Sequence, residues 1–227
     1  IVIPADVRAE ISRFEGFGKA AFVLSIRGEK VSVSFPLNGK HNIMNALAAA
    51  AVGFSFGMSA LEIAAALTSV EAPPQRGEVL RFARGFTVIN DSYNSNPDAL
   101  LSMVDTLVEG SPNAGRRIVV AGEMLELGHN AQAIHAKIGE SIAAKNIDIL
   151  IGVRGLAEET VVAARANFTG NKIARFAEDA DAAGELLVQS IQPGDVVLVK
   201  GSRGVRTEKV IEKLLEKFDI EEEKEAV

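Results

Sequence analysis

The sequence lacks cysteine and has a single tyrosine, Tyr93. Without cysteine the chain has no disulfides and no thiolate metal sites, which fits a reducing compartment. No stretch is long and apolar enough to span a membrane, and the first ten residues lack the layout of a signal peptide. The net charge of -6 leaves no basic excess to neutralise phosphates. We therefore expect a soluble, cytoplasmic monomer with neither a membrane nor a nucleic-acid partner.

Two common nucleotide-binding motifs are also missing. GFGKA (16–20) ends like a Walker A loop, but Arg13 stands where the first glycine belongs and Ala20 where Ser or Thr belongs. No G-x-G-x-x-G follows a strand-like run, which counts against a dinucleotide enzyme. His129 and His135 have no third ligand nearby, so no metal site is expected.

The chain begins with a mixed region of strands and helices. Two strand-like runs, AAFVLSI (20–26) and KVSVSF (30–35), lie on either side of a turn, which indicates a hairpin. HNIMNALAAAAVGFSFG (41–57) is Ala-rich and nearly free of charge, which is typical of a buried helix, here ending at Gly57. Ser59 with Glu62 has the spacing of a capping box and predicts a second helix.

After the prolines of EAPPQRGE, strand-like and helical patterns alternate. The strand-like runs are FTVIN, RRIVVAG, IDILIGV, NKIARF and DVVLVK, and helical patterns separate them. Strands alternating with helices of this length predict an α/β fold with a mostly parallel sheet covered by helices on both faces. We expect two domains, residues 1–75 and 76–227.

Three polar segments follow strands of this sheet: NDSYNSNP, GEMLELGHN and KGSRG. Ligands bind outside the carboxyl ends of parallel strands, so these segments are candidate sites. Tyr93 offers a flat face on which a base can stack, and the Asp91 carboxylate suits ribose hydroxyls. The alternative is that Asn, Asp, Ser and Pro only form the turn.

Two other groups of side chains suit a ligand. His41, Asn42 and Asn45 project from one region of a helix, and an Asn amide matches the hydrogen-bonding edge of adenine. The alternative is that His41 and Asn42 cap that helix. Lys200 and Arg203, at a strand end among small residues, suit a carboxylate or phosphate, or else belong to an ordinary surface loop.

In combination, these segments resemble the Mur ligase family over nearly the whole chain. The similar stretches, in order, are GKHNIMNALAAAAVG, PPQRGEV, INDSYNSNPDAL, VVAGEMLELG followed by His135, and LVKGSRGVRTEKVIEKL. Members of the family have a UDP-substrate domain, a central P-loop ATPase domain and a Rossmann-like C-terminal domain. The resemblance implies that this chain holds the last part of the second domain and all of the third, without the UDP-substrate domain and the P-loop.

The resemblance also implies an activity: ATP-dependent ligation of D-alanyl-D-alanine to UDP-N-acetylmuramoyl-tripeptide, through an acyl phosphate, in peptidoglycan precursor synthesis. Mg²⁺ would assist, bound by ligands upstream of this chain, and the fragment alone would be inactive, with no catalytic residue of its own. The residues implied to bind ATP are Asn42, Asn45, Arg76, Asp91, Tyr93 and Asn94. Those implied to face the dipeptide or other substrate are Asn96, Lys200, Ser202 and Arg203.

One position departs from the family pattern, because Glu123 stands where that pattern has Asp. A longer carboxylate keeps the charge but moves it, so no role follows for Glu123 from the sequence. Two other readings stay open. The chain could come from a related ligase, such as a folylpolyglutamate or cyanophycin synthetase, or it could be a non-catalytic α/β binding module.

Overall fold

The structure is a computed structural model that describes residues 6–14, 19–37, 39–71 and 73–221. It divides into two compact units, residues 1–73 and 74–227. The division lies two residues from the domain boundary expected from the sequence. Most of the GFGKA segment, residues 16–18, lies outside the described residues.

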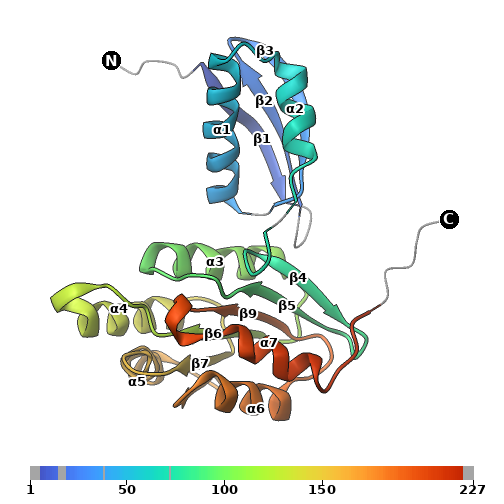
Figure 1. The fold of residues 1–227 in the computed structure, drawn as a ribbon. Coiled ribbons are helices and arrows are strands. Elements are labelled where there is room, and N and C mark those ends of the chain that lie inside the picture. The colour runs from blue at the N-terminus through green and yellow to red at the C-terminus, as the bar shows by residue number, and fades with distance from the viewer. Residues whose placement is uncertain (1–5, 15–18, 38, 72, 222–227) are drawn as a thin grey trace. The chain divides into compact units, whose positions relative to one another are not determined.

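The amino-terminal unit is a small antiparallel sheet with two helices packed against it (Figure 1). The elements are β1 (Val7–Phe14), β2 (Ala20–Ile26), β3 (Glu29–Phe35), α1 (Lys40–Ser55) and α2 (Ala60–Thr68). The predicted hairpin is confirmed: β2 pairs with β3, and both turn residues between them have positive φ. Alternate residues of the two strands, such as Leu24 and Val33, are buried against the helices.

Helix α1 is only partly buried, which corrects the expectation of a buried helix. Ile43, Ala46 and Ala50 form the stripe that packs on the sheet, whereas Met44 is 64% exposed and Val52 58% exposed. Small uncharged residues tolerate both environments, so the scarcity of charge did not require burial. Within the described residues, no helix is both long and apolar enough to cross a membrane.

Helix α2 begins with the predicted capping box. The Ser59 hydroxyl and backbone N–H both donate to the Glu62 carboxylate, at 2.7 and 2.9 Å, and the Glu62 N–H donates back to the hydroxyl. The hydrogen bond from the Ser59 side chain is the main reason that the pKa of Glu62 is held below its usual value.

A pH titration tests this cap. Because the folded-state pKa is lowered, the cap contributes stability above the unfolded-state pKa of Glu62, and the contribution is lost as the pH falls through the folded-state pKa. We expect the Glu62 side-chain carbonyl carbon, followed by NMR, to titrate below the usual range of glutamate. In the Ser59→Ala variant its midpoint should move up toward that range. Equal midpoints in the two proteins would show that the serine does not hold the charge.

The carboxy-terminal unit contains a six-stranded sheet in the order β4-β5-β9-β6-β7-β8. Its strands are β4 (Glu78–Phe82), β5 (Phe86–Asp91), β6 (Arg117–Gly122), β7 (Ile149–Val153), β8 (Ile173–Ala177) and β9 (Val196–Lys200). Its α-helices are α3 (Pro97–Gly110), α4 (Ala131–Ala143), α5 (Ala157–Asn167), α6 (Ala180–Ser190) and α7 (Glu208–Leu215). The short helices η1 (Gly128–Asn130) and η2 (Arg203–Val205) lie in strand-to-helix connections.

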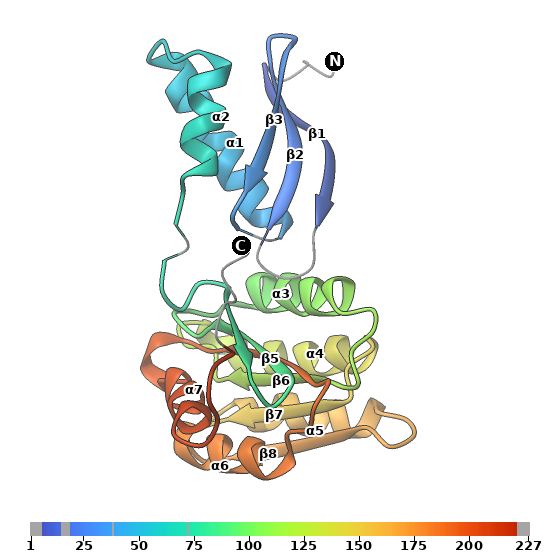
Figure 2. The ribbon, with the colours of Figure 1, turned by 90° about the vertical axis from the view of Figure 1, so that its right-hand side faces the viewer.

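The predicted α/β class is confirmed for this unit. Helices α3, α4 and α5 cover one face of the sheet and α6 and α7 the other (Figure 2). The inner strands read as continuous apolar runs because both of their faces are buried: in β6, Ile118 and Val120 face α6 and α7, while Val119 is buried on the other face. Strand β4, which the sequence did not predict, pairs antiparallel with β5 at the edge.

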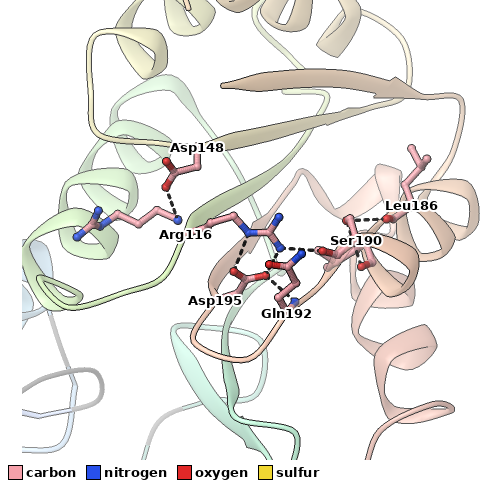
Figure 3. A network of polar contacts seen from close by, with 8 residues as sticks. Arg116, Asp148, Leu186, Ser190, Gln192 and Asp195 are labelled. Carbon is pink, nitrogen blue, oxygen red and sulfur yellow. Dashed lines mark hydrogen bonds and ion pairs between the residues drawn. The ribbon is translucent and has the colours of Figure 1, made fainter. Parts of the chain in front are cut away.

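An ion-pair network links the amino ends of β6 and β9. The Arg116 guanidinium donates from Nε and Nη2 to the two carboxylate oxygens of Asp195, at 2.9 and 2.6 Å, and from Nη2 to the Ser190 carbonyl (Figure 3). The hydrogen bond to Asp195 raises the pKa of Arg116 above its usual value. Asp195 also accepts the Gln192 N–H. This network ties together the edge of the sheet opposite the three polar segments.

Candidate functional site

The topology brings the three polar segments together. They follow β5, β6 and β9, and β9 lies between the other two, so all three leave the same edge of the sheet. The helices after β5 and β6 lie on one face, whereas α7, after β9, lies on the other. In open parallel sheets, the carboxyl edge at such a reversal between neighbouring strands is where ligands commonly bind.

Part of the NDSYNSNP segment forms its own turn. Asn90 and Ser92 are buried: Asn90 donates to the Glu78 carboxylate at 2.9 Å, and the Ser92 hydroxyl donates to the Asn90 side-chain oxygen at 2.7 Å. Asn96 caps α3 by accepting the Ala99 N–H. The turn-forming interpretation therefore holds for Asn90, Ser92 and the side-chain oxygens of Asn94 and Asn96. Asp91, Tyr93 and the exposed amide groups of Asn94 and Asn96 remain as candidates for a ligand.

Asp91 and Lys200 form a buried ion pair at this edge. They are register partners at the ends of the parallel strands β5 and β9. The Lys200 ammonium donates to Asp91 Oδ2 at 2.5 Å and to the backbone carbonyl of Asn94 at 2.8 Å. Lys200 is only 4% exposed. Its charge is therefore directed into the protein in this conformation.

Tyr93, in the first segment, and Arg76, just before β4, are exposed and contact each other. The tyrosine is 44% exposed, and the Arg76 guanidinium lies 4.2 Å from the centre of its ring. This contact is a cation–π interaction. The Tyr93 N–H donates to the Gln75 carbonyl, which fixes the position of Arg76 beside the ring. An accessible ring and an exposed guanidinium suit a planar base and an anionic group.

Ser202 joins all three segments. Its hydroxyl accepts the Leu125 N–H at 3.1 Å, from the segment after β6, and donates to the Ser95 carbonyl at 3.4 Å, from the segment after β5. Gly201 lets the backbone approach Thr207 closely, because a Cβ there would meet the threonine side chain at 2.6 Å. Among the described residues, the buried Ser95 hydroxyl has no hydrogen-bond partner.

Two arginines lie on the exposed side of these segments. Arg203 is exposed, and its Nη1 donates to side-chain oxygens of Gln75 and Glu208 at 3.3 and 3.4 Å. Arg154, which the sequence analysis missed, follows β7 with φ of 67° and donates from Nη1 to the Gly204 carbonyl at 2.7 Å. Its place directly after an apolar strand was the signal that could have identified it.

Glu123 has a structural role that the sequence did not reveal. Its Oε1 accepts the Leu156 N–H at 3.0 Å, just before α5 begins at Ala157. The carboxylate also packs on Gly155, where a Cβ would meet it at 2.4 Å. A carboxylate at a helix amino terminus satisfies an unpaired N–H and interacts favourably with the helix dipole.

We expect Glu123→Ala to lower the free energy of unfolding by about 1 kcal/mol, the usual effect of losing a helix cap. Glu123→Gln, which keeps an acceptor without the charge, should lose less. Glu158→Ala is the matched control, because Glu158 is an exposed acidic residue in the first turn of the same helix. Urea unfolding measures all three, and equal losses for Glu123→Ala and Glu158→Ala would exclude the capping role.

The remaining predicted residues lie in the amino-terminal unit. Helix α1 begins at Lys40, with Gly39 at its N-cap position, so His41 and Asn42 lie in the first turn rather than at the N-cap. Asn45 is exposed and Asn42 half-buried. Burial therefore does not force Asn45 to find a partner. The assignment of both amides to adenine stays a prediction.

Buried His135 holds the segment after β6. Its Nε2 accepts the Met124 N–H at 3.0 Å, and Nδ1 lies 2.8 Å from the Ala131 carbonyl, an arrangement that places the proton on Nδ1. Both ring nitrogens are thus used inside the protein. In the part of the chain that the structure describes, no group of three acidic or histidine side chains could hold a metal ion.

Comparisons with known proteins identify the family and the fold. Residues 75–203, more than half of the chain, match the family described as "Mur ligase, glutamate ligase domain". The UDP-N-acetylmuramoyl-tripeptide–D-alanyl-D-alanine ligase of Bacillus subtilis is 30% identical over 192 residues, which cover 85% of this chain and 42% of the relative. The enzyme of the same name from Escherichia coli is 34% identical over 196 residues, covering 86% and 41%.

The crystal structure of MurF from Acinetobacter baumannii superposes with a TM-score of 0.80 at 27% identity, covering 93% of this chain and 45% of that one. The chain thus spans less than half the length of the curated relatives it matches. The matched residues include the segments after β5 and β6 and reach Arg203 in the segment after β9. By its sequence and by the segments that meet at the sheet edge, the chain belongs to the Mur ligase family.

Proposed function

We propose that this chain is the carboxy-terminal part of an ATP-dependent ligase that adds D-alanyl-D-alanine to UDP-N-acetylmuramoyl-tripeptide. The observation that carries the proposal is the meeting of the three polar segments at one sheet edge, joined by Ser202. Relatives named for this reaction cover most of the chain. We also propose that this reaction belongs to peptidoglycan precursor synthesis and that a monomer carries it out in the cytoplasm.

The nucleotide side of the site would be formed by Asp91, Tyr93, Asn94 and Arg76. A carboxylate with a free oxygen suits ribose hydroxyls, and an exposed tyrosine ring suits adenine. Within the part of the chain that the structure describes, Arg76 contacts the ring of Tyr93 and forms no ion pair, so its charge is available for a phosphate. Asn42 and Asn45, on α1, stay proposed contacts for the adenine edge, as the family resemblance implies. ATP supplies the phosphoryl group that activates the acceptor carboxylate, and Mg²⁺ would be held by residues outside this chain.

The amine-donor side would be formed by Arg203, Ser202 and Asn96. Arg203 is exposed in the segment after β9, and its guanidinium can bind a carboxylate through two parallel hydrogen bonds. The dipeptide would be held by its terminal carboxylate, which leaves its amine free to attack. Ser202 would act by holding the loop that carries Arg203, since its hydroxyl is committed to Leu125 and Ser95.

An amine-donor assay separates this proposal from its alternatives. The complete protein is incubated with ATP and UDP-N-acetylmuramoyl-tripeptide, and ADP release and product mass are measured with D-alanyl-D-alanine or with L-glutamate. We expect product only with the dipeptide. A parallel incubation replaces the UDP-tripeptide with a folate acceptor, and product with glutamate there would favour a folylpolyglutamate synthetase. No ADP release with any donor or acceptor would favour a binding module. The 227-residue chain alone should release no ADP.

Arg203→Lys in the complete protein tests the carboxylate contact. Lysine keeps the charge but provides one point contact instead of two parallel donors. We expect the Michaelis constant for D-alanyl-D-alanine to rise at least about tenfold, equivalent to ~1.4 kcal/mol, with much smaller changes for ATP and the UDP-tripeptide. Arg206→Lys is the matched control, because Arg206 is equally exposed in the same loop. A rise in all three constants would assign Arg203 a structural role.

A further inference from the structure

Lys200 has an unusual environment for a lysine. Its side chain is 5% exposed, and lysine is rarely buried unless its charge is paired. Here the ammonium makes two hydrogen bonds, to the Asp91 carboxylate and to the Asn94 carbonyl. The pairing is set by the sheet itself, because Lys200 and Asp91 are register partners on neighbouring strands. To reach an incoming substrate, Lys200 would have to leave Asp91 without its partner.

The pair also determines how Asp91 is presented. Its Oδ2 atom is held by Lys200, whereas Oδ1 has no hydrogen-bond partner within the described part of the chain. The Asp91 side chain is 16% exposed. One oxygen is therefore anchored and the other is left for a ligand. Through the Asn94 carbonyl, the same ammonium restrains the turn that carries Tyr93.

We propose that Lys200 is a positioning residue for the nucleotide rather than a contact for the dipeptide. It fixes the carboxylate of Asp91 so that Oδ1 faces the ribose hydroxyls, and it holds the following turn in place. This inference rests on the proposed function, because it takes the ribose role of Asp91 from there. It replaces the expectation from the sequence that Lys200 faces the amine donor.

The test compares the binding of ADP with that of 2′,3′-dideoxy-ADP, which lacks the two ribose hydroxyls. The 227-residue chain is labelled with ¹⁵N and titrated with each nucleotide, and the amide shifts of residues 91–96 give the two dissociation constants even when binding is weak. We expect the unsubstituted chain to prefer ADP about tenfold. Lys200→Met should reduce the ratio of the dissociation constants for dideoxy-ADP and ADP to near one. Lys200→Arg, which keeps the charge, should retain part of the preference for ADP.

The ratio is chosen because a purely structural role would not change it. A general loss of stability weakens the binding of both nucleotides equally, whereas a misplaced Asp91 weakens only the binding of ADP, which has the ribose hydroxyls. Lys209→Met is the matched control, because Lys209 also pairs with an aspartate, Asp181, in the same unit. Its ratio should equal that of the unsubstituted chain. If Lys200→Met does not fold, Lys200→Gln, which keeps two N–H donors without the charge, takes its place.

The outcomes separate this inference from the function on which it rests. If the unsubstituted chain binds both nucleotides equally, or neither, the ribose role of Asp91 fails and the inference falls with it. If the unsubstituted chain prefers ADP, and Asp91→Ala loses that preference while Lys200→Met keeps it, the nucleotide site stands and the positioning role of Lys200 is overturned.

Discussion

Replacing Asp195 with alanine is expected to lower the free energy of unfolding of the carboxy-terminal unit by about 3 kcal/mol. Asp195 is 2% exposed, and its carboxylate accepts two hydrogen bonds from Arg116 and one from the Gln192 N–H. Breaking a buried ion pair by removing one partner costs roughly 3–5 kcal/mol, since the other charge is left unpaired. The lower end applies because the Arg116 side chain is 28% exposed, so water can hydrate part of its charge.

Urea unfolding followed by circular dichroism measures this loss. Glu216→Ala is the matched control, because Glu216 also forms an ion pair in this unit but is 61% exposed. Surface pairs of that kind contribute about 0–1 kcal/mol. If Asp195→Ala costs no more than Glu216→Ala, the network at the amino ends of β6 and β9 does not stabilise the fold.

Replacing Asp91 with alanine is expected to weaken nucleotide binding about ten- to a hundredfold. Hydrogen bonds to a charged group contribute roughly 1.5–3 kcal/mol each, which corresponds to that range. The same change leaves the buried Lys200 ammonium without its counter-ion, so the variant should also be less stable. The measurements are the nucleotide dissociation constant and the midpoint of thermal unfolding.

A second variant separates the two effects. Adding Lys200→Met to Asp91→Ala removes the unpaired ammonium, so stability should recover in part while nucleotide binding stays weak. If affinity returns together with stability, Asp91 acts only through the fold, and the ribose assignment is wrong. An unchanged dissociation constant in Asp91→Ala alone would have the same meaning.

The parallel sheet could be predicted because its strands are buried on both faces. Runs such as DVVLVK are almost uninterrupted apolar stretches, and helical patterns of ordinary length separate them. The edge strands are different. In β1 and β4, charged residues such as Glu10 and Arg81 interrupt the apolar pattern, so neither strand was predicted individually. Propensity alone cannot identify a strand that the neighbouring strand stabilises by pairing.

The site could be predicted only up to the strand order. That the polar segments follow strands is readable from the sequence, but the insertion of β9 between β5 and β6 is not. The pairing of Asp91 with Lys200 depends on that insertion and joins residues 109 positions apart. Because the sequence does not show this pairing, it predicted Lys200 to be a cation available to a ligand. The role of Glu123 depends on a contact with the segment after the neighbouring strand β7. Arg154 reaches from the end of β7 to the segment after β9, two strands away in the sheet.

The claim that the carboxyl edge of β5, β9 and β6 is the ligand site is tested most directly by a crystal structure of this chain with ADP. The account predicts nucleotide density at that edge, with the ribose within hydrogen-bond distance of Asp91 Oδ1 and the base against the Tyr93 ring. Lys200 should remain paired with Asp91. Density at the opposite edge beside Arg116 and Asp195, or no density at saturating ADP, would contradict the account.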